Sequence, residues 1–319
     1  MKLSIIIPTR DRTEILQRTI SNLVEAINGT DAEILIVNDS TLPINLKEKN
    51  SFIKILSNSK SGAASARNTG VRESTGELLL FLDDDIIINK SNILKTLSLH
   101  QNSVKSAFNF FWLYPPDLIE SLPKSSFGRY IIRHLLFSNS YRIKINDRIN
   151  ELIETDGLTS QYFSIHKSDF LLSGGYNENI PFAGSEDLIL YKELTKSGIK
   201  VFISPSDIIF QNESDRIVLR SMLDRSRRGA ITMRKAEIAG YETSVTFSRT
   251  RKIFYPFFVH FQSPIYRLIK LIPNKRALDP VYFKLTNLLL SLSFYEGYYT
   301  RKRFYTIINK RGSGRNTNS

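Results

Sequence analysis

The chain has 319 residues, of which 41% are hydrophobic and 24% are charged, and its formal net charge is +13. This composition is ordinary for a globular protein of one large or two modest domains, and it excludes a chain that is disordered throughout. The absence of cysteine excludes disulfides, thiolate metal sites and cysteine nucleophiles, and it is compatible with a reducing compartment. The apolar run that ends at Pro8 is too short for a signal peptide, so we expect a cytoplasmic location.

The first third of the chain alternates the patterns of strands and helices. Short apolar runs predict strands, and apolar residues at a spacing of three or four predict helices. In chain order we expect a strand at residues 3–7, a helix at 12–27, strands at 33–37 and 52–56, a helix at 62–73 and a strand at 77–82. This alternation predicts an α/β fold with a mostly parallel central sheet flanked by helices.

Polar residues follow three of these strands where the strands end. They are Thr9, Asp39 and the triplet Asp83-Asp84-Asp85. Ligands of such sheets bind beyond the carboxyl ends of the strands. We therefore expect these residues to converge on one site.

The rest of the chain is less regular. Residues 115–150 contain several prolines and basic residues, and we interpret them as an excursion or lid near an acceptor. The next expected elements are a strand at 157–166, a helix at 185–196, a strand at 200–204 and a helix at 217–239. We expect residues 1–240 to form the catalytic domain, residues 241–310 a helical extension and residues 311–319 a disordered tail.

The triplet Asp83-Asp84-Asp85 is the sharpest local motif. It directly follows a run of five apolar residues, and Asp83 and Asp85 can point to the same side. Hard cations such as Mg²⁺ and Mn²⁺ prefer oxygen ligands and often share them with a substrate's phosphates. Like charges at the mouth of a buried strand repel one another, which favours a bound cation over the alternative of a solvated acidic turn.

Two further segments are candidates for binding and catalysis. The small residues around Ala63 run into a helix that carries Arg67, which is suited to a phosphate or simply to close packing on the sheet. The segment differs from a P-loop and from GxGxxG. Glu186 and Asp187 begin another helix, where acidic residues are common as N-terminal charge but are also placed to act as a general base.

Three arginines lie close together on the helix predicted at 217–239. Arg225, Arg227 and Arg228 either form a solvated basic face or hold a diphosphate or an anionic acceptor. The four histidines are scattered without metal-ligand spacing, and we expect them to be structural.

Six of these motifs, taken in order over roughly residues 1–230, resemble the family 2 glycosyltransferases, which have the glycosyltransferase A fold. The motifs are Ser4-Ile5-Ile6-Ile7-Pro8-Thr9, Val37-Asn38-Asp39-Ser40, Ala66-Arg67-Asn68-Thr69-Gly70, Phe81-Leu82-Asp83-Asp84-Asp85, Gly174-Gly175-Tyr176-Asn177-Glu178 and Glu186-Asp187-Leu188. The resemblance implies an inverting, metal-dependent enzyme that moves a sugar from a nucleoside-diphosphate sugar, typically a UDP-sugar, to an acceptor hydroxyl. The acceptor is expected to be a glycan, lipid-linked or on the cell surface.

The resemblance also implies roles for individual residues. Asp187 matches the catalytic base with Glu186 beside it, and Asp83 and Asp85 match the acids that hold Mn²⁺ or Mg²⁺ against the donor diphosphate. The residues expected on the nucleotide or its diphosphate are Pro8, Thr9, Arg12, Asp39, Arg67, Asp84, Arg225 and Arg228. Loops 156–164 and 181–185 are expected to contact the donor sugar.

One position departs from the family's pattern. Many relatives carry a histidine after the strand that follows the Glu-Asp helix, whereas this chain has Ile209-Phe210-Gln211-Asn212-Glu213. A role of that histidine in metal or leaving-group contact is absent here or has passed to Gln211 or Asn212.

The C-terminal segment concentrates the positive charge. Residues 251–319 contain 13 lysines and arginines, among them Arg301, Lys302 and Arg303, against only Asp279 and Glu296. Its apolar runs are shorter than the about 20 residues of a spanning helix. We expect this segment to lie on an anionic membrane surface, the alternatives being a closed helical domain or an oligomer interface. Nucleic acid is not expected, because the apolar runs exceed what a phosphate-binding tail requires.

Two rival functions remain open. A non-catalytic, membrane-attached scaffold would keep the fold without the chemistry, although Asp83, Asp85 and Asp187 all being present argues against it. A nucleotidyltransferase would also use paired acids and a metal, but the chain lacks the early glycine-rich loop of such enzymes. Release of pyrophosphate rather than nucleoside diphosphate would identify it.

Overall fold

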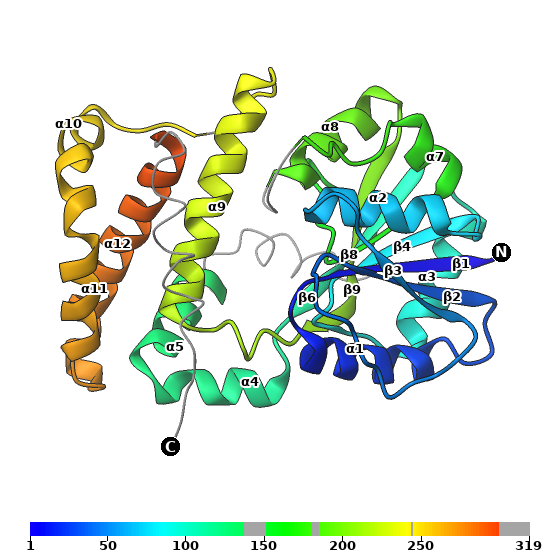
Figure 1. The fold of residues 1–319 in the computed structure, drawn as a ribbon, viewed down its shortest axis with the longest axis horizontal. Coiled ribbons are helices and arrows are strands. Elements are labelled where there is room, and N and C mark those ends of the chain that lie inside the picture. Colours follow the sequence, from blue (N-terminus) through cyan, green and yellow to red (C-terminus); the bar gives the residue numbers. More distant parts are fainter. Residues whose placement is uncertain (137–150, 180–184, 244, 300–319) are drawn as a thin grey trace.

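The computed structural model describes residues 1–136, 151–179, 185–243 and 245–299, which form a sheet-containing lobe and a helical lobe (Figure 1). The strands belong to one sheet. In their order across it they are β3 (Ile53–Ser57), β2 (Ala32–Asn38), β1 (Leu3–Thr9), β4 (Leu78–Leu82), β8 (Tyr162–His166), β6 (Ser106–Leu113), β9 (Lys200–Gln211) and β5 (Ile86–Ile87), with β7 (Ile153–Glu154) also paired to β9.

Most strands of the described sheet run in one direction, as predicted. Strands β3, β2, β1, β4, β6 and β9 share that direction, and β8, β5 and β7 run against it. The carboxyl ends of the six strands therefore meet at one edge of the sheet. Because β8 is antiparallel, the loop before Tyr162 reaches the same edge, beside the end of β4.

Helices cover both faces of the sheet. On one face, α1 (Thr13–Ala26) and α3 (Lys90–Gln101) pack on the side chains that β1 and β4 direct there. On the other face lie α2 (Ala63–Glu73), α7 (Lys167–Leu172) and α8 (Glu186–Lys196). The alternation of β1, with Ile5 in the first core and Ile6 in the second, follows from the period of two of a strand.

The second lobe has a core of its own. It is built by α4 (Pro116–Ser121), α5 (Ser126–Ile131), α9 (Leu219–Ile238), α10 (Arg249–Phe258), α11 (Gln262–Leu271) and α12 (Asp279–Tyr299), with the short turns η1 (Leu122–Lys124), η2 (Ile132–Leu136), η3 (Val259–Phe261) and η4 (Arg276–Leu278). Aromatic and aliphatic side chains from α5, α9, α11 and α12 fill the core. The predicted C-terminal helical extension is therefore confirmed.

Helix α9 packs directly against α12. A Cβ atom on Gly297 would lie 2.3 Å from the carbonyl oxygen of Arg227, so this crossing requires a glycine. Ser293 donates a hydrogen bond of 3.0 Å to the Leu223 carbonyl across the same contact. The domain boundary near residue 240 stays a prediction, and α9 before it packs with α12 after it.

Two strands differ from their predicted bounds. The strand expected at 157–166 begins only at Tyr162. The Thr159 and Ser160 amides donate to the side chains of Asn109 and Asp187 and not to the backbone of a neighbouring strand. The strand expected at 200–204 continues to Gln211. A register shift against β6 between Phe110 and Phe111 accommodates Pro205, which lacks an N–H to donate.

Within the described residues no helix is both long and apolar enough to cross a membrane. The disordered tail expected at 311–319, the cluster Arg301 to Arg303, residues 181–184 of the expected donor-sugar loop and residues 137–150 of the expected lid lie outside the described residues. The earlier part of that excursion forms α4, η1, α5 and η2 in the second lobe.

Candidate active site

Arg67 joins the acidic motifs at the carboxyl edge of the sheet. It lies on α2, and its guanidinium contacts Asp83 after β4 at 2.9 Å and Glu186 at the start of α8 at 3.3 Å. The guanidinium also stacks on the Tyr176 ring, 5.3 Å from its centroid. Arg67 is 4% exposed, and burial acts to lower its pKa, but Asp83, Asp187 and Glu186 all raise it.

We expect Arg67→Met to destabilise the protein by roughly 3–5 kcal/mol, because it removes the buried guanidinium that pairs with the carboxylates of Asp83 and Glu186. Urea unfolding measures the difference. The matched control is Arg72→Met on the same helix, where an exposed arginine pairs with Glu178 and the change should cost about 0–1 kcal/mol. Equal stabilities of the two variants would contradict the structural importance of the Arg67 contacts.

Asp187 lies beside Glu186 and is held by Ser160. The Ser160 amide donates to one carboxylate oxygen at 2.9 Å, and the Ser160 hydroxyl donates to the other. The Ser160 hydroxyl also forms a hydrogen bond of 2.8 Å with the Tyr176 hydroxyl. Burial, reinforced by the negative charge of Glu186, raises the pKa of Asp187 to about 7, against the opposing effects of Arg67 and Ser160. A carboxylate with such a pKa is suited to accept a proton near neutral pH.

The raised pKa of Asp187 makes stability depend on pH. The unfolded chain has an ordinary aspartate pKa of about 4, so the folded state binds the proton more tightly and this contribution is lost as pH rises from about 4 through about 7. We therefore expect Asp187→Asn to gain stability relative to the wild type between pH 5 and pH 8. Denaturant unfolding at both values tests this. A stability difference that does not change with pH would refute it.

Arg12 organises the other side of the acidic triplet. Its guanidinium makes two hydrogen bonds to Asp215, at 2.9 and 3.1 Å, one to Asp85 at 3.0 Å and one to Asp84. Asp84 also accepts from the Thr9 hydroxyl at 2.7 Å. Burial acts to lower the pKa of Arg12, but Asp215, Asp84 and Asp85 outweigh it and raise the pKa. The structure thus places Arg12, Thr9 and Asp84 in a buried network under the predicted nucleotide site.

Asp85 is 2% exposed and lies near several charged groups. Burial raises its pKa to about 7, Asp83 adds to the increase, and Arg12 opposes it. The side-chain amide of Gln211, at the end of β9, approaches Asp85 at 3.5 Å and contacts Gln161 at 2.8 Å. Of the two residues suggested in place of the missing histidine, Gln211 lies beside the acidic triplet.

The donor set fits a hard divalent cation. Within the described chain, no group of three or more His, Cys, Asp or Glu side chains is placed to hold a metal ion. The protein's contribution would be the carboxylates of Asp83 and Asp85, because Gln211 turns its side-chain nitrogen toward Asp85 and its oxygen accepts from Gln161. Mg²⁺ and Mn²⁺ accept such oxygen ligands and take others from a substrate's phosphates.

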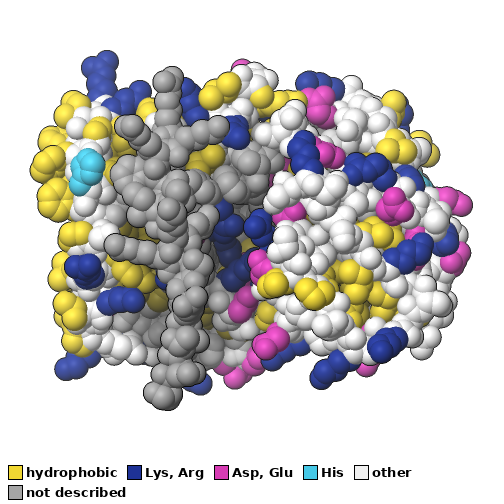
Figure 2. All heavy atoms as spheres, in the orientation of Figure 1, with side chains coloured by type: hydrophobic (Ala, Val, Ile, Leu, Met, Phe, Trp, Pro, Cys, Tyr) yellow, Lys and Arg dark blue, Asp and Glu magenta, His cyan; other side chains and the backbone are white. Residues whose placement is uncertain are grey.

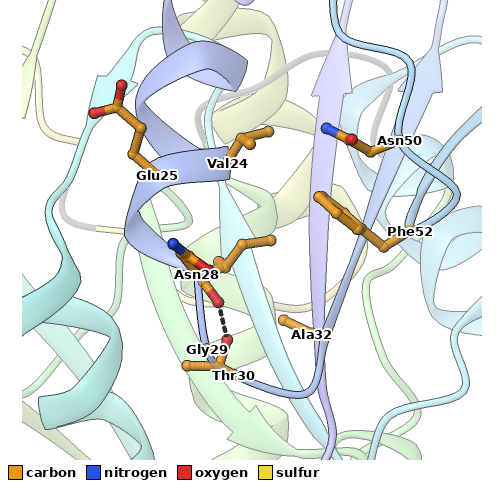
Figure 3. A pocket seen from close by; sticks show the side chains of 9 residues that line it. Val24, Glu25, Asn28, Gly29, Thr30, Ala32, Asn50 and Phe52 are labelled. Atoms are coloured by element: carbon orange, nitrogen blue, oxygen red, sulfur yellow. Dashed lines mark hydrogen bonds between the residues drawn. The ribbon is translucent and has the colours of Figure 1, made fainter.

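Two cavities flank the ends of β2. One of about 470 Å³ opens at the carboxyl edge and is lined by Thr9, Arg12, Asn38 and Ser40 among others. The other, of about 350 Å³, lies at the opposite end of the strands, where the Thr30 hydroxyl donates to the Ile27 carbonyl (Figure 3). Only the first adjoins the predicted site residues.

The remaining predicted site residues lie around this edge. Asp39 accepts from the Gly62 amide at 3.0 Å and from Asn58 at 2.7 Å, which holds the loop before α2. Pro8 is partly buried within β1. Arg225 on α9 pairs with Glu213 at 2.6 Å. Burial acts to lower the pKa of Arg225, but Glu213, Tyr114 and, more weakly, Asp85 raise it.

The other arginines of α9 point elsewhere. Arg227 pairs with Glu296 of α12 at 2.6 Å, inside the second lobe. Arg228 is exposed, and its guanidinium donates to the Asp224 carbonyl of its own helix at 3.4 Å. Of the three, Arg225 is the one that the structure brings toward the acidic triplet.

Several residues at this edge have no conspicuous motif in the sequence. They are Ser160, Gln161, Glu213 and Asp215. Glu213 is 5% exposed and accepts from the Tyr114 hydroxyl at 3.2 Å as well as from Arg225. The contact between Arg12 and Asp215 spans 203 residues, which no local pattern indicates.

Comparison with known proteins adds independent findings. A model of the glycosyl transferase family 2 matches residues 4–168, just over half of the chain. A poly(ribitol-phosphate) β-N-acetylglucosaminyltransferase of Staphylococcus aureus is 30% identical over 146 residues, 40% of this chain and 41% of that protein. A GalNAc(5)-diNAcBac-PP-undecaprenol β-1,3-glucosyltransferase of Campylobacter jejuni is 27% identical over 210 residues, 60% of each chain. The chain thus spans at most three fifths of these relatives.

Two solved structures resemble the fold. A mannosyltransferase of Pyrobaculum calidifontis with GDP-mannose and Mn²⁺ has a TM-score of 0.50 at 11% identity, over 98% of this chain and 79% of that one. GalNAc-T7 with UDP, GalNAc and Mn²⁺ has a TM-score of 0.52 at 14% identity, over 97% of this chain and 57% of the other. At these identities the likeness concerns the fold alone.

Proposed function

The chain belongs to glycosyl transferase family 2 and has the glycosyltransferase A fold. We propose that it is a metal-dependent enzyme that transfers a sugar from a nucleoside-diphosphate sugar to an acceptor hydroxyl. The observation that supports this most directly is the position of Arg67. It contacts the acidic triplet at Asp83 and the start of α8 at Glu186, next to Asp187. The proposed cation site and the proposed general base thus lie on either side of one guanidinium.

We further propose that transfer inverts the anomeric centre in a single displacement. Asp187 accepts the proton of the acceptor hydroxyl, while the oxygen of that hydroxyl forms a bond to the anomeric carbon. The bond from that carbon to the diphosphate oxygen breaks, and the nucleoside diphosphate leaves. The buried Ser160 contacts fix Asp187 for this role.

The leaving diphosphate gains negative charge, which positive groups at the edge can offset. Arg225 is placed to do so, because its side chain is 53% exposed, is held by Glu213 and lies near enough to Asp85 to interact with its charge. A divalent cation held by Asp83 and Asp85, when bound, supplies further positive charge to the diphosphate. The two solved neighbours likewise contain Mn²⁺ together with a nucleotide or nucleotide sugar.

The nucleotide of the donor is proposed to be UDP. Its base would lie toward Asp39, the position that in the family typically hydrogen-bonds uracil. Thr9, Asn38 and Ser40 line the 470 Å³ cavity beside it, which has room for a nucleoside.

The acceptor is proposed to be a lipid-linked or cell-surface glycan, with the enzyme peripheral on the cytoplasmic face of a membrane. The C. jejuni relative is named for a polyprenol-linked acceptor and the S. aureus relative for a poly(ribitol-phosphate) acceptor. The excess of positive charge in residues 251–319 agrees with such a location.

Release of nucleoside diphosphate from a panel of nucleotide sugars tests the proposal, with Mn²⁺ and then with chelator. Slow donor hydrolysis without acceptor is enough, and membrane extract supplies acceptor where it is needed. Chelator-sensitive release from one donor would identify the sugar. If no donor releases nucleoside diphosphate and no nucleotide binds, the non-catalytic scaffold is favoured instead.

A further inference from the structure

An exposed apolar face runs along α10, η3 and α11, which follow one another almost without interruption from Arg249 to Leu271. Seven large apolar side chains on it are between 39% and 78% exposed. They are Ile253, Phe254, Phe257, Phe258, Phe261, Leu268 and Leu271, and we call them the apolar face of α10–α11. The exposed phenylalanines of the described chain all lie within this set.

The spacing of these residues makes them one surface. At about 100° per helical residue they fall within an arc of about 140°. Phe261 lies with its ring centroid 5.3 Å from that of Phe257 and 6.3 Å from that of Phe258, so these aromatic rings form a cluster. Contiguous exposed apolar surface of this kind marks an interaction site.

The opposite side of the same segment is held by the protein. Ile269 is 2% exposed in the core of the helical lobe, the ring centroid of Tyr255 lies 5.5 Å from that of Tyr295 of α12, and Gln262 donates to Glu296 at 3.0 Å. The segment is therefore seated by one face on α12. The fold leaves the apolar face outward.

Positive charge surrounds the apolar face. Residues 249–278 contain no Asp or Glu, and they carry seven exposed basic residues. These are Arg249, Arg251, Lys252, Arg267, Lys270, Lys275 and Arg276. Figure 2 shows hydrophobic and basic side chains together along the outer edge of the molecule where α10 and α11 lie in Figure 1. A partner for this surface has to be apolar inside and anionic at its boundary.

A bilayer that contains anionic lipid has those properties. Amphipathic helices with aromatic residues on one side and basic residues beside them lie in the boundary between head groups and acyl chains. A second copy of the chain fits less well, because it would bring two sets of seven cations together at the rim. No described helix is both long and apolar enough to cross a membrane, and one side of the segment packs on α12, so the segment lies along the surface rather than across it.

We propose that the apolar face of α10–α11 docks this protein on an anionic membrane, with the phenylalanine cluster inserted among the lipids and the flanking cations on the head groups. This inference rests on the proposed function, in which the acceptor is carried by the membrane. It assigns the membrane contact to α10, η3 and α11, not to the C-terminal segment as a whole.

Vesicle co-sedimentation of the full chain tests the proposal. The vesicles are phosphatidylcholine alone or phosphatidylcholine with one quarter phosphatidylglycerol. The test variant is Phe254→Ser/Phe257→Ser/Phe261→Ser, and a second is Leu268→Ser/Leu271→Ser. The matched control is Leu171→Ser/Leu172→Ser, which changes exposed leucines of α7 in the other lobe. Thermal unfolding checks that each variant folds, and donor hydrolysis without vesicles checks the active site.

We expect the wild type and the α7 control to bind anionic vesicles, and we expect the affinity of both test variants for these vesicles to be lower by about tenfold or more. Their donor hydrolysis should match the wild type. Unchanged vesicle binding of the folded test variants would overturn the assignment of the surface. A wild type that ignores vesicles but hydrolyses donor would overturn the docking alone. Vesicle binding without donor turnover would support the docking and count against the proposed function.

Discussion

Asp187→Asn is expected to lower the rate of sugar transfer by about 10²–10⁴-fold, the usual contribution of a positioned general base. Asparagine keeps an oxygen that can accept from the Ser160 amide, so the loop before β8 should stay in place. What the variant loses is the ability to take the proton of the acceptor hydroxyl. Single-turnover transfer at saturating donor and acceptor measures this loss directly.

The matched control is Glu193→Gln on the same helix. Glu193 pairs with Lys196 on the outside of α8, away from the site, and its replacement should leave the rate within twofold or so of the wild type. Donor binding, measured by calorimetry, should be similar for all three proteins. A transfer rate that survives Asp187→Asn would remove this residue from the mechanism.

The same assignment predicts the pH dependence of the wild-type rate. Burial and the nearby Glu186 raise the pKa of Asp187 to about 7, and only the ionised form can accept the proton. Transfer should therefore slow about tenfold for each pH unit below 7, and it should level off above it. A rate that is flat from pH 5 to pH 8 would show that another group is the base.

The acidic residues of the site were predictable because their local context is informative. A carboxylate triplet directly after a buried apolar strand, as at Asp83, and an acidic pair at the start of a helix, as at Asp187, lie on short stretches of sequence. Strands and helices of the first 82 residues follow from apolar periodicity for the same reason. Helix α1, expected at 12–27, spans Thr13–Ala26.

The contacts that tie those residues together were not predictable from any local pattern. Arg67 and Glu186 are 119 residues apart, and their contact depends on how α2 and α8 pack on one face of the sheet. Ser160 is a common residue in an irregular loop, and it gains its importance only because β8 runs antiparallel beside β4. Gln211 was singled out only as a departure from the family's pattern, and the extension of β9 past Pro205 brings it to Asp85.

Burial also separates residues that the sequence groups together. Asp83, Asp84 and Asp85 are adjacent, yet Asp83 pairs with Arg67 while Asp84 and Asp85 contact Arg12. The side chain of Asp83 is 30% exposed, and that of Asp84 is 8% exposed. Asp84 and Arg12 therefore support the site from beneath, and their predicted contact with the donor stays a prediction.

Asp85→Asn should abolish both the binding of Mn²⁺ and the stimulation of transfer by it. Burial and the charge of Asp83 raise the pKa of Asp85 to about 7, so the folded protein holds an unfavourable concentration of negative charge that a cation would relieve. We expect Mn²⁺ with nucleoside diphosphate to raise the melting temperature of the wild type, because a ligand that binds only the folded state stabilises it. The variant should show no such increase.

The transfer rate of Asp85→Asn should fall by about 10²–10³-fold, to that of the wild type in chelator, because both lose the charge that offsets the departing diphosphate. Asp117→Asn, on the exposed side of α4, is the control for a changed carboxylate elsewhere. Calorimetric titration measures the binding of Mn²⁺ to the variant. A melting curve at the same pH shows whether the variant is folded. If Asp85→Asn keeps both its Mn²⁺ affinity and its chelator-sensitive rate, the cation lies elsewhere. Asp85 would then serve only to hold Arg12 in the buried network with Asp215.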